Sequence, residues 1–181
     1  MVEDNETEAG PGRPGHRAGR FMLYGAWAMV LLILSSIFGL WEGNRLNPNT
    51  SPESRVAADG AREVVLERNA KGHYVTNGYI NGHPVTFLLD TGATDVSIPA
   101  ALATTLGLDR GMARAAQTAN GVIRVYDTRL DELSIGNIRL FGVRASINPA
   151  YRNDEILLGM SALKQLDFAQ RGRELVLRQL P

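Results

Sequence analysis

Phe87-Leu88-Leu89-Asp90-Thr91-Gly92-Ala93 is the most informative stretch of the sequence. An apolar run ends directly in an aspartate, and a hydroxyl residue and a glycine follow. Apolar neighbours withdraw a carboxylate from water and make its charged form costly. Gly92 lets another backbone approach closely, and the Thr91 hydroxyl can form a hydrogen bond across the junction. The pattern indicates a reactive carboxylate at Asp90; an ordinary strand-end turn is the alternative, because Asp, Thr and Gly are common turn residues.

Short β-type runs separated by turn residues fill residues 62–181. The expected strands cover Glu63–Glu67, His73–Ile80, Val85–Leu89, Gln117–Ala119, Val122–Leu130, Leu133–Ile135, Ile138–Val143, Asp167–Ala169 and Glu174–Leu177. The predicted turns lie at Asn81-Gly82, Asn120-Gly121, Gly136-Asn137 and Arg171-Gly172. Two short helices are expected, at Ala100–Leu106 and Ser161–Leu166. Many short strands with few helices predict a closed or sandwiched all-β domain.

A second apolar run, Ile156-Leu157-Leu158-Gly159, ends in glycine before the second expected helix. With this run the sequence resembles the retropepsin-like aspartic proteases, the family of the retroviral proteases, and especially bacterial members with one N-terminal membrane span. The matching features keep the family's order: Asp90-Thr91-Gly92-Ala93, the hairpin Thr118-Ala119-Asn120-Gly121 in the place of a flap, Leu157-Leu158-Gly159, and a short helix. The resemblance covers roughly Glu63 to Leu177. It departs at Thr94, where many viral members have an acidic residue, so we assign no substrate role to Asp95.

The resemblance implies an acid-protease-type closed barrel and an aspartic endopeptidase that hydrolyses peptide bonds with an activated water. Asp90 would be catalytic, Thr91, Gly92 and Ala93 would form the active-site loop, and the flap residues Thr118, Ala119, Asn120 and Gly121 would bind substrate. In such enzymes two carboxylates share one proton. The chain has one Asp-Thr-Gly, and its only other Asp-Thr pair, Asp127-Thr128, precedes Arg129 and is interpreted as strand surface. The second aspartate is therefore expected from a second copy in a homodimer.

Composition excludes several classes of protein. The chain has no cysteine and its formal net charge is zero, so thiol nucleophiles and cysteine-based zinc sites are excluded and no nucleic-acid partner is expected. The three histidines lie at His16, His73 and His83 without a His/Glu pair at ligand spacing. We expect neither a metal site nor a cofactor, and a protein or peptide as substrate.

The N-terminal part predicts a membrane anchor. Residues 1–20 are rich in Gly, Pro and charge and predict a disordered tail. Residues 21–41 contain no charged side chain and would form a helix of roughly 31 Å, which matches a hydrocarbon core of about 30 Å. Residues 42–61 predict a flexible linker. Three arginines precede the span and Arg45 follows it, so we expect a single-pass protein of the bacterial inner membrane with a cytoplasmic N-terminus and a periplasmic protease domain.

Two other functions stay open at this point. The same fold could serve as a catalytically silent, membrane-tethered module that binds peptides or takes part in envelope assembly. An envelope protein in which Asp90 merely closes a turn is a further alternative. An intact Asp-Thr-Gly favours the protease, because a binding module has no need of a costly, partly buried carboxylate.

Overall fold

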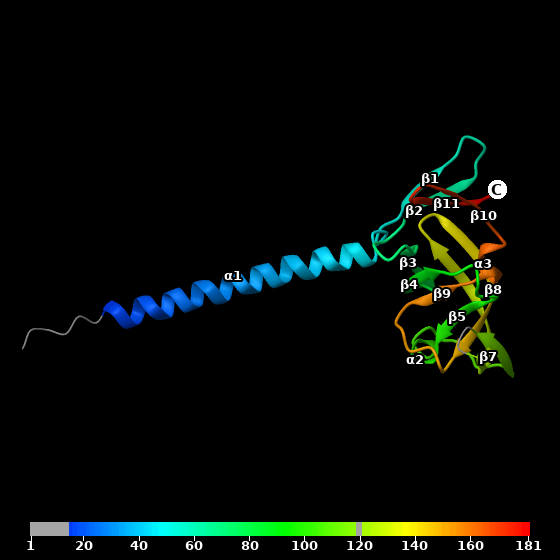
Figure 1. Cartoon of the computed structure of the whole chain (residues 1–181). Coiled ribbons are helices and arrows are strands. Elements are labelled where there is room, and N and C mark those ends of the chain that lie inside the picture. Colours follow the sequence, from blue (N-terminus) through cyan, green and yellow to red (C-terminus); the bar gives the residue numbers. More distant parts are fainter. Residues whose placement is uncertain (1–14, 119–120) are drawn as a thin grey trace, which may run out of the picture. The chain divides into compact units, whose positions relative to one another are not determined.

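The computed structural model of the protein describes residues 15–118 and 121–181. The chain divides into two units, one that ends at Trp41 and one that covers Glu42–Pro181 (Figure 1). Residues 1–14 of the predicted tail lie outside the described residues, and Gly15 to Arg20 already belong to helix α1 (Gly15–Leu46).

Helix α1 carries the predicted membrane span. Its segment Phe21–Gly43 is 23 residues long and no part of its most apolar window is buried within the protein. Large apolar side chains such as Phe21, Leu32 and Trp27 are more than half exposed. A helix of this length and composition could cross a membrane. In that case lipid would cover its exposed apolar side chains.

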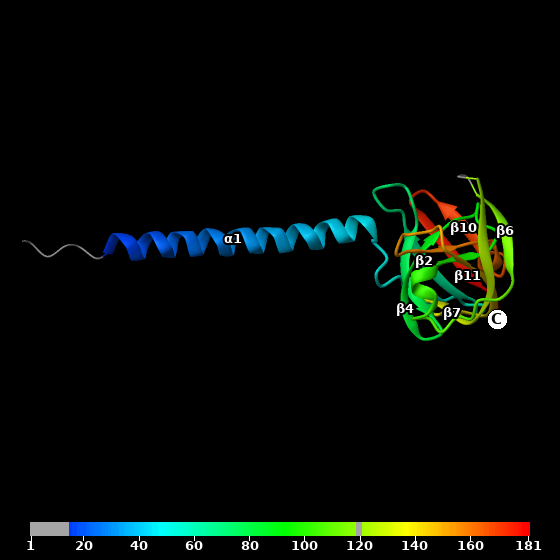
Figure 2. The same ribbon diagram turned by 90° about the horizontal axis from the view of Figure 1, so that it is seen from below.

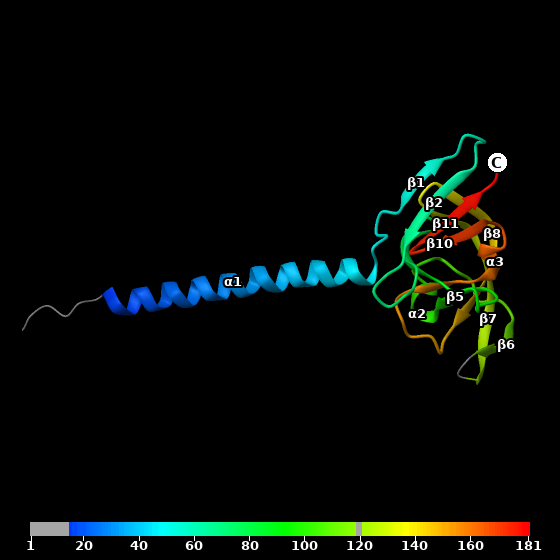
Figure 3. The same ribbon diagram turned by 45° about the horizontal axis from the view of Figure 1, so that its top comes forward.

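After the end of α1, the described residues of the second unit form two sheets and two short helices. The four-stranded sheet has the order β1-β2-β11-β10 (Figure 3) and comprises β1 (Glu53–Val56), β2 (Arg62–Glu67), β11 (Glu174–Gln179) and β10 (Asp167–Arg171). The seven-stranded sheet has the order β3-β4-β9-β5-β8-β7-β6 and comprises β3 (Val75–Ile80), β4 (His83–Leu89), β9 (Ile156–Leu158), β5 (Val96–Pro99), β8 (Ile138–Asn148), β7 (Gly121–Ile135) and β6 (Ala113–Thr118). The helices are α2 (Ala100–Ala103) and α3 (Met160–Leu163).

The seven-stranded sheet curls back on itself around the core. β3 pairs with β7 at Tyr79↔Ser134 and Ile80↔Leu133, and Phe87 and Leu130 are among the side chains fully buried inside. The return pairing covers two residue pairs and the four-stranded sheet keeps separate edges, so the barrel is not strictly closed. The expected all-β domain with short helices is confirmed, and the strict closure is not.

Local sequence signals located several turns correctly. Asn81 and Gly82 join β3 to β4 with positive φ angles of 49° and 80°, as a two-residue hairpin turn requires. Gly136-Asn137 joins β7 to β8 as predicted. The last turn is shifted by one residue, because β10 runs to Arg171. Both helices stop earlier than expected, after one turn each.

The segment expected as a flexible linker, residues 42–61, holds structure of its own. The carbonyls of Arg45 and Leu46 accept hydrogen bonds from Ala70 N and Asn69 Nδ2, at 3.2 and 2.8 Å. Asn49 is buried, and its side chain bonds Glu67 N at 2.7 Å. β1 then pairs along β2. Composition alone could not reveal this, because the partners of these polar residues lie some 20 positions away.

Candidate active site

The loop that follows β4 is held by β9 and α3. β4 and β9 are parallel neighbours with Leu89 opposite Leu158, and Asp90 N donates to the Leu158 carbonyl at 3.2 Å. The amides of Met160 and Ser161 donate to the carbonyls of Ala93 and Thr94, at 2.8 and 2.9 Å. The two motifs of the sequence, which lie almost 70 residues apart, therefore form one unit.

Gly159 makes this packing possible. A Cβ atom at this position would lie 2.2 Å from the Asp95 carbonyl oxygen and 2.7 Å from that of Ala93. Backbone atoms cannot give way by that much, so no larger residue fits without moving the loop. The glycine that ends the second apolar run is thus explained by a close approach of backbone.

Asp90 lies at the edge of a partly apolar hollow. Its carboxylate is half-buried, and Oδ1 accepts a hydrogen bond from Gly92 N at 2.9 Å. Among residues 15–118 and 121–181, no donor is recorded for Oδ2. The hollow has a volume of ≈ 340 Å³, and its other lining residues are Tyr74, Leu89, Thr91, Leu163, Phe168, Gln170 and Leu175. Thr91 and Gly92 are exposed, so the tip of the loop is accessible from the surface of the protein.

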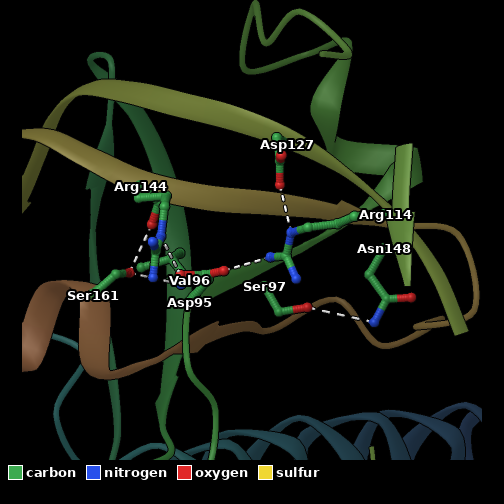
Figure 4. Close-up of polar contacts among 8 residues, drawn as sticks. All are labelled: Asp95, Val96, Ser97, Arg114, Asp127, Arg144, Asn148 and Ser161. Carbon is green, nitrogen blue, oxygen red and sulfur yellow. Dashed lines mark hydrogen bonds and ion pairs between the residues drawn. The ribbon is translucent and has the colours of Figure 1, made fainter. Parts of the chain in front are cut away.

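Asp95, five positions later, has very different surroundings. It is 7% exposed, and its two oxygens accept from Arg114 Nη2 at 2.5 Å and Arg144 Nε at 2.7 Å (Figure 4). Arg114 also donates from Nε to Asp127 Oδ1 at 2.6 Å. This network joins the start of β5 to β6, β7 and β8.

Ser161 completes the same region. Its hydroxyl donates to the Arg144 carbonyl at 2.6 Å and accepts from Val96 N at 3.0 Å (Figure 4). Sequence reasoning did not find this network, because its members come from separate strands and no spacing links them. The sequence analysis assigned no substrate role to Asp95. In the structure both of its carboxylate oxygens are bound by arginines of the same chain.

The β6–β7 hairpin stands where the sequence predicted a flap (Figure 2). Thr118 and Gly121 are paired at its end, and Thr118 Oγ1 donates to the Gly121 carbonyl at 2.8 Å. Ala119 and Asn120, the other predicted flap residues, lie outside the described residues. The role of this hairpin as a flap stays a prediction.

Tyr151 is a neighbour of the site that the sequence did not single out. Burial raises the pKa of its phenol above the ordinary value, and the negative charges of Glu155 and Asp90 act in the same direction. A hydrogen bond with Asn153 opposes the increase. The charge on Asp90 is the smallest of these four influences on the pKa of Tyr151.

The comparisons with known proteins agree with this geometry. The family described as "gag-polyprotein putative aspartyl protease" matches residues 76–165, which include the Asp90 loop and Gly159. An uncharacterized protein from the cobV 5′ region of a Sinorhizobium species is 32% identical over 84% of this chain and 70% of its own length. An uncharacterized protein of Rickettsia prowazekii is 29% identical over 57% of this chain and 45% of its own length.

A solved structure gives the same fold. A retropepsin-like aspartic protease from Rickettsia conorii has a TM-score of 0.58 and 26% identity, over 71% of this chain and 96% of its own. The fold and the family match define an aspartic-protease-like domain. The chain belongs to the retropepsin-like aspartic protease family.

Proposed function

We propose that the protein is a membrane-anchored aspartic endopeptidase in which Asp90 residues from two copies form the catalytic dyad. The observation that supports this most strongly is the position of Asp90. It ends an apolar strand in a partly apolar hollow, with one oxygen fixed by Gly92 N and the other without a recorded donor in the described part of the chain. One copy supplies one such carboxylate. A second copy, related by a two-fold axis beside the exposed loop tip, would supply the other.

The chemistry follows from placing two carboxylates together. Two unit charges about 4 Å apart repel by about 4 kcal/mol at an effective dielectric near 20. One Asp90 therefore keeps its proton while the other is ionised. The ionised carboxylate takes a proton from a water molecule, and the protonated one donates to the substrate carbonyl as the tetrahedral intermediate forms. The Gly92 N–H bond to Oδ1 keeps each carboxylate in one orientation.

The substrate would be an extended peptide. It would lie between the dyad and the β6–β7 hairpin, with backbone pairing for affinity and side-chain pockets for selection. Closure of that hairpin would exclude water from the reaction.

Helix α1 would anchor the enzyme in the bacterial inner membrane, with the N-terminus in the cytoplasm and the β domain in the periplasm. Its length, its composition and the arginines before the span support this topology. Confinement to a membrane raises the local concentration of copies and favours their pairing. A C-terminal reporter that is active only outside the cytoplasm tests the orientation, and an inactive reporter would contradict it.

Cleavage of peptides by the full chain in detergent micelles tests the activity. We expect the wild type to cleave members of a mixed peptide library, a statine-type inhibitor to stop it, and Asp90→Asn to abolish cleavage. Asp131→Asn, which changes an exposed carboxylate of β7, is the matched control and should cleave like the wild type. Undiminished cleavage by Asp90→Asn would refute the assignment. Binding of peptides without cleavage by the wild type would favour the silent binding module.

A further inference from the structure

The first residues after the candidate membrane span are attached to the β domain. The span ends at Gly43. The carbonyls of Arg45 and Leu46 accept hydrogen bonds from Ala70 N and Asn69 Nδ2, at 3.2 and 2.8 Å. Asn69 is 6% exposed, and a buried amide that lost its partners would leave polar atoms unsatisfied. The attachment therefore begins at Arg45, two residues after the span.

Asn49 forms a second point of attachment, between the end of β2 and the start of β3. It is 4% exposed. Its Nδ2 donates to the carbonyls of Glu67 and Val75 at 2.9 and 2.7 Å, and its Oδ1 accepts from Glu67 N at 2.7 Å. These bonds use both N–H groups and the oxygen of the side-chain amide. The Asn49 carbonyl also accepts from Asn77 N at 3.2 Å, so this one residue joins the chain to two strands.

Asn47 connects the end of the helix with Asn49. Its backbone N–H donates to the Gly43 carbonyl at 2.9 Å and continues the helical pattern. Its side chain donates from Nδ2 to Asn77 Oδ1 at 2.9 Å and accepts at Oδ1 from Asn49 N at 3.0 Å. We call Asn47, Asn49 and Asn69 the asparagine clasp, because their side chains fix the stretch that follows the span.

The asparagine clasp also lies close to Asp90. Asn49 forms a bridge with Thr76 of β3, and Thr76 is opposite Phe87 of β4, three residues before Asp90. Neighbouring strands lie about 4.8 Å apart and a strand rises about 3.3 Å per residue, so roughly 14 Å separate Asn49 from Asp90. From Gly43 to Asn49 the chain adds one helical turn and two more residues. Asp90 therefore stays within about 30 Å of the end of the span.

A flexible tether would give a much longer reach. Residues 42–61 would measure about 65 Å when fully extended, and Asp90 could then meet peptides at many distances from the membrane. The asparagine clasp removes this freedom, because it binds the chain to β2 and β3 at the start of that segment.

We infer that the asparagine clasp sets the reach of the protease and thereby its class of substrate. The substrates are extended segments of other membrane-attached proteins, close to the point where each leaves the membrane, and segments farther out are not cut. Asn47, Asn49 and Asn69 are positioning residues that act through the placement of Asp90. The inference rests on the proposed function, which supplies the anchor and the cleavage, and it adds the substrate class.

Two insertions of Gly-Ser-Gly-Ser-Gly-Ser into the full-length protein in liposomes test the clasp. The first follows Gly43, between the span and the clasp. The second is the matched control and follows Ser51, an exposed residue beyond the clasp. Both lengthen residues 42–61 equally, by up to about 20 Å. If the clasp holds, only the first moves Asp90 away from the membrane; in a flexible tether both have the same effect.

Cleavage at defined distances from the membrane is the first measurement. The substrates are single-span proteins in the same liposomes, with a peptide that the wild type cleaves in free form. Pro-rich spacers of about 3.1 Å per residue hold this peptide about 15, 45 or 90 Å from the membrane.

The wild type and the Ser51 insertion should cleave the nearest of these substrates at least about tenfold faster than the middle one, which lies beyond the reach of the anchored enzyme. The Gly43 insertion should remove most of this difference. All three proteins should leave the farthest substrate uncut and cleave the free peptide equally. Equal effects of both insertions, or cleavage by the wild type that is independent of distance, would overturn the inference.

A fluorophore in the clasp region gives a measurement that needs no catalysis. Lys71 is exposed and the chain has no cysteine, so Lys71→Cys provides one labelling site. Spin labels on the lipid headgroups should quench the fluorophore in the wild type and in the Ser51 insertion. The Gly43 insertion should lose most of this quenching. Equal quenching in all three proteins would contradict the clasp.

Asn49→Ala tests the clasp by substitution. We expect it to raise cleavage of the middle substrate relative to the nearest one, as the Gly43 insertion does. Thr50→Ala, at the exposed neighbouring position, is the control and should keep the wild-type ratio. A merely structural role of Asn49 would lower cleavage of all substrates by the same factor, and that result would contradict a positioning role.

The failure of the clasp and the failure of the enzyme can be told apart. Peptide cleavage that depends on Asp90, together with equal effects of the two insertions, would overturn the clasp and keep the enzyme. Quenching that responds only to the Gly43 insertion, without cleavage of any peptide, would keep the clasp but overturn the proposed function and the substrate class with it.

Discussion

Asp90 and Asp95 lie five positions apart in one loop, but their carboxylates differ in burial and in hydrogen-bond partners. Asp95 is buried, and two arginines from other strands occupy its oxygens. Asp90 is half-buried, and within residues 15–118 and 121–181 its carboxylate accepts one hydrogen bond, from Gly92 N of its own loop. A carboxylate whose two oxygens bind arginines of the same chain stabilises the fold. A carboxylate beside an exposed loop tip, with one oxygen that accepts no hydrogen bond from the described residues, is available for chemistry. The contrast separates a structural aspartate, Asp95, from the candidate catalytic one, Asp90, without reference to any relative.

The largest expected effect comes from Asp90→Asn. We expect peptide cleavage to fall by about 10³-fold or more, because the neutral amide can neither activate water nor share a proton. Thermal unfolding of the full chain should shift little, since the amide oxygen still accepts from Gly92 N. A large drop in the unfolding temperature would contradict the contrast, because Asp90 would then be a structural residue as well.

Gly159→Ala should damage both aspartate regions at once. The added methyl group meets the carbonyls of Asp95 and Ala93, and overpacking of this kind costs about 1–3 kcal/mol. We expect lower stability in denaturant unfolding and a loss of most activity, since the Asp90 loop must move. Gly43→Ala is the control, because nothing lies within 4 Å of the added atom. An unchanged Gly159→Ala protein would show that the loop is not held as described.

Asp95→Asn should have the reverse signature of Asp90→Asn. Removal of one partner of a buried ion pair costs about 3–5 kcal/mol, but Arg114 and Arg144 are 36% and 62% exposed and can be solvated again, so we expect about 2 kcal/mol. Cleavage per folded molecule should fall much less than in Asp90→Asn. Asp131→Asn again serves as the exposed control. If Asp95→Asn kept full stability but lost all activity, Asp95 would be the catalytic residue, and the roles assigned to Asp90 and Asp95 would be wrong.

The smallest expected effect concerns Tyr151. Because the Asp90 charge helps to raise the pKa of Tyr151, Asp90→Asn should lower that pKa, and tyrosinate absorbance with Tyr151→Phe as the reference would detect it. A phenol whose pKa is raised on folding stabilises the protein below the ordinary tyrosine value of about 10, and this contribution is lost as the pH rises through the higher folded value. An identical titration in both proteins would place Asp90 too far from Tyr151.

The parts of the fold that the sequence predicted are those fixed by neighbouring residues. Asn81-Gly82 specifies a hairpin turn by its own backbone preferences, and an apolar run that ends in Asp-Thr-Gly marks a strand that enters a tight loop. The apolar helix is equally local, because twenty or so uncharged residues need no partner to be recognised. The family resemblance added the order of the Asp90 and Gly159 motifs along the chain, whereas their packing against each other came from the structure.

The parts that the sequence did not predict depend on distant partners. Asp95 meets Arg144 because β5 pairs with β8, and it meets Arg114 of β6, which pairs with β7 in the same sheet. The composition around Asn49 predicts a linker. In the structure its side-chain amide donates hydrogen bonds to the carbonyls of Glu67 and Val75. The sequence predicted β10 as one half of a hairpin, and its position beside the Asp90 hollow followed only from the structure.

Activity in mixtures of wild type and Asp90→Asn tests the central claim most directly. The two full-length proteins are mixed in micelles at constant total concentration, with time for subunits to exchange. If every active site needs Asp90 from both copies, activity follows the square of the wild-type fraction, and an equal mixture retains about a quarter of the wild-type activity. Activity of about one half, in proportion to the wild-type fraction, would show that a single Asp90 suffices and would contradict the shared dyad.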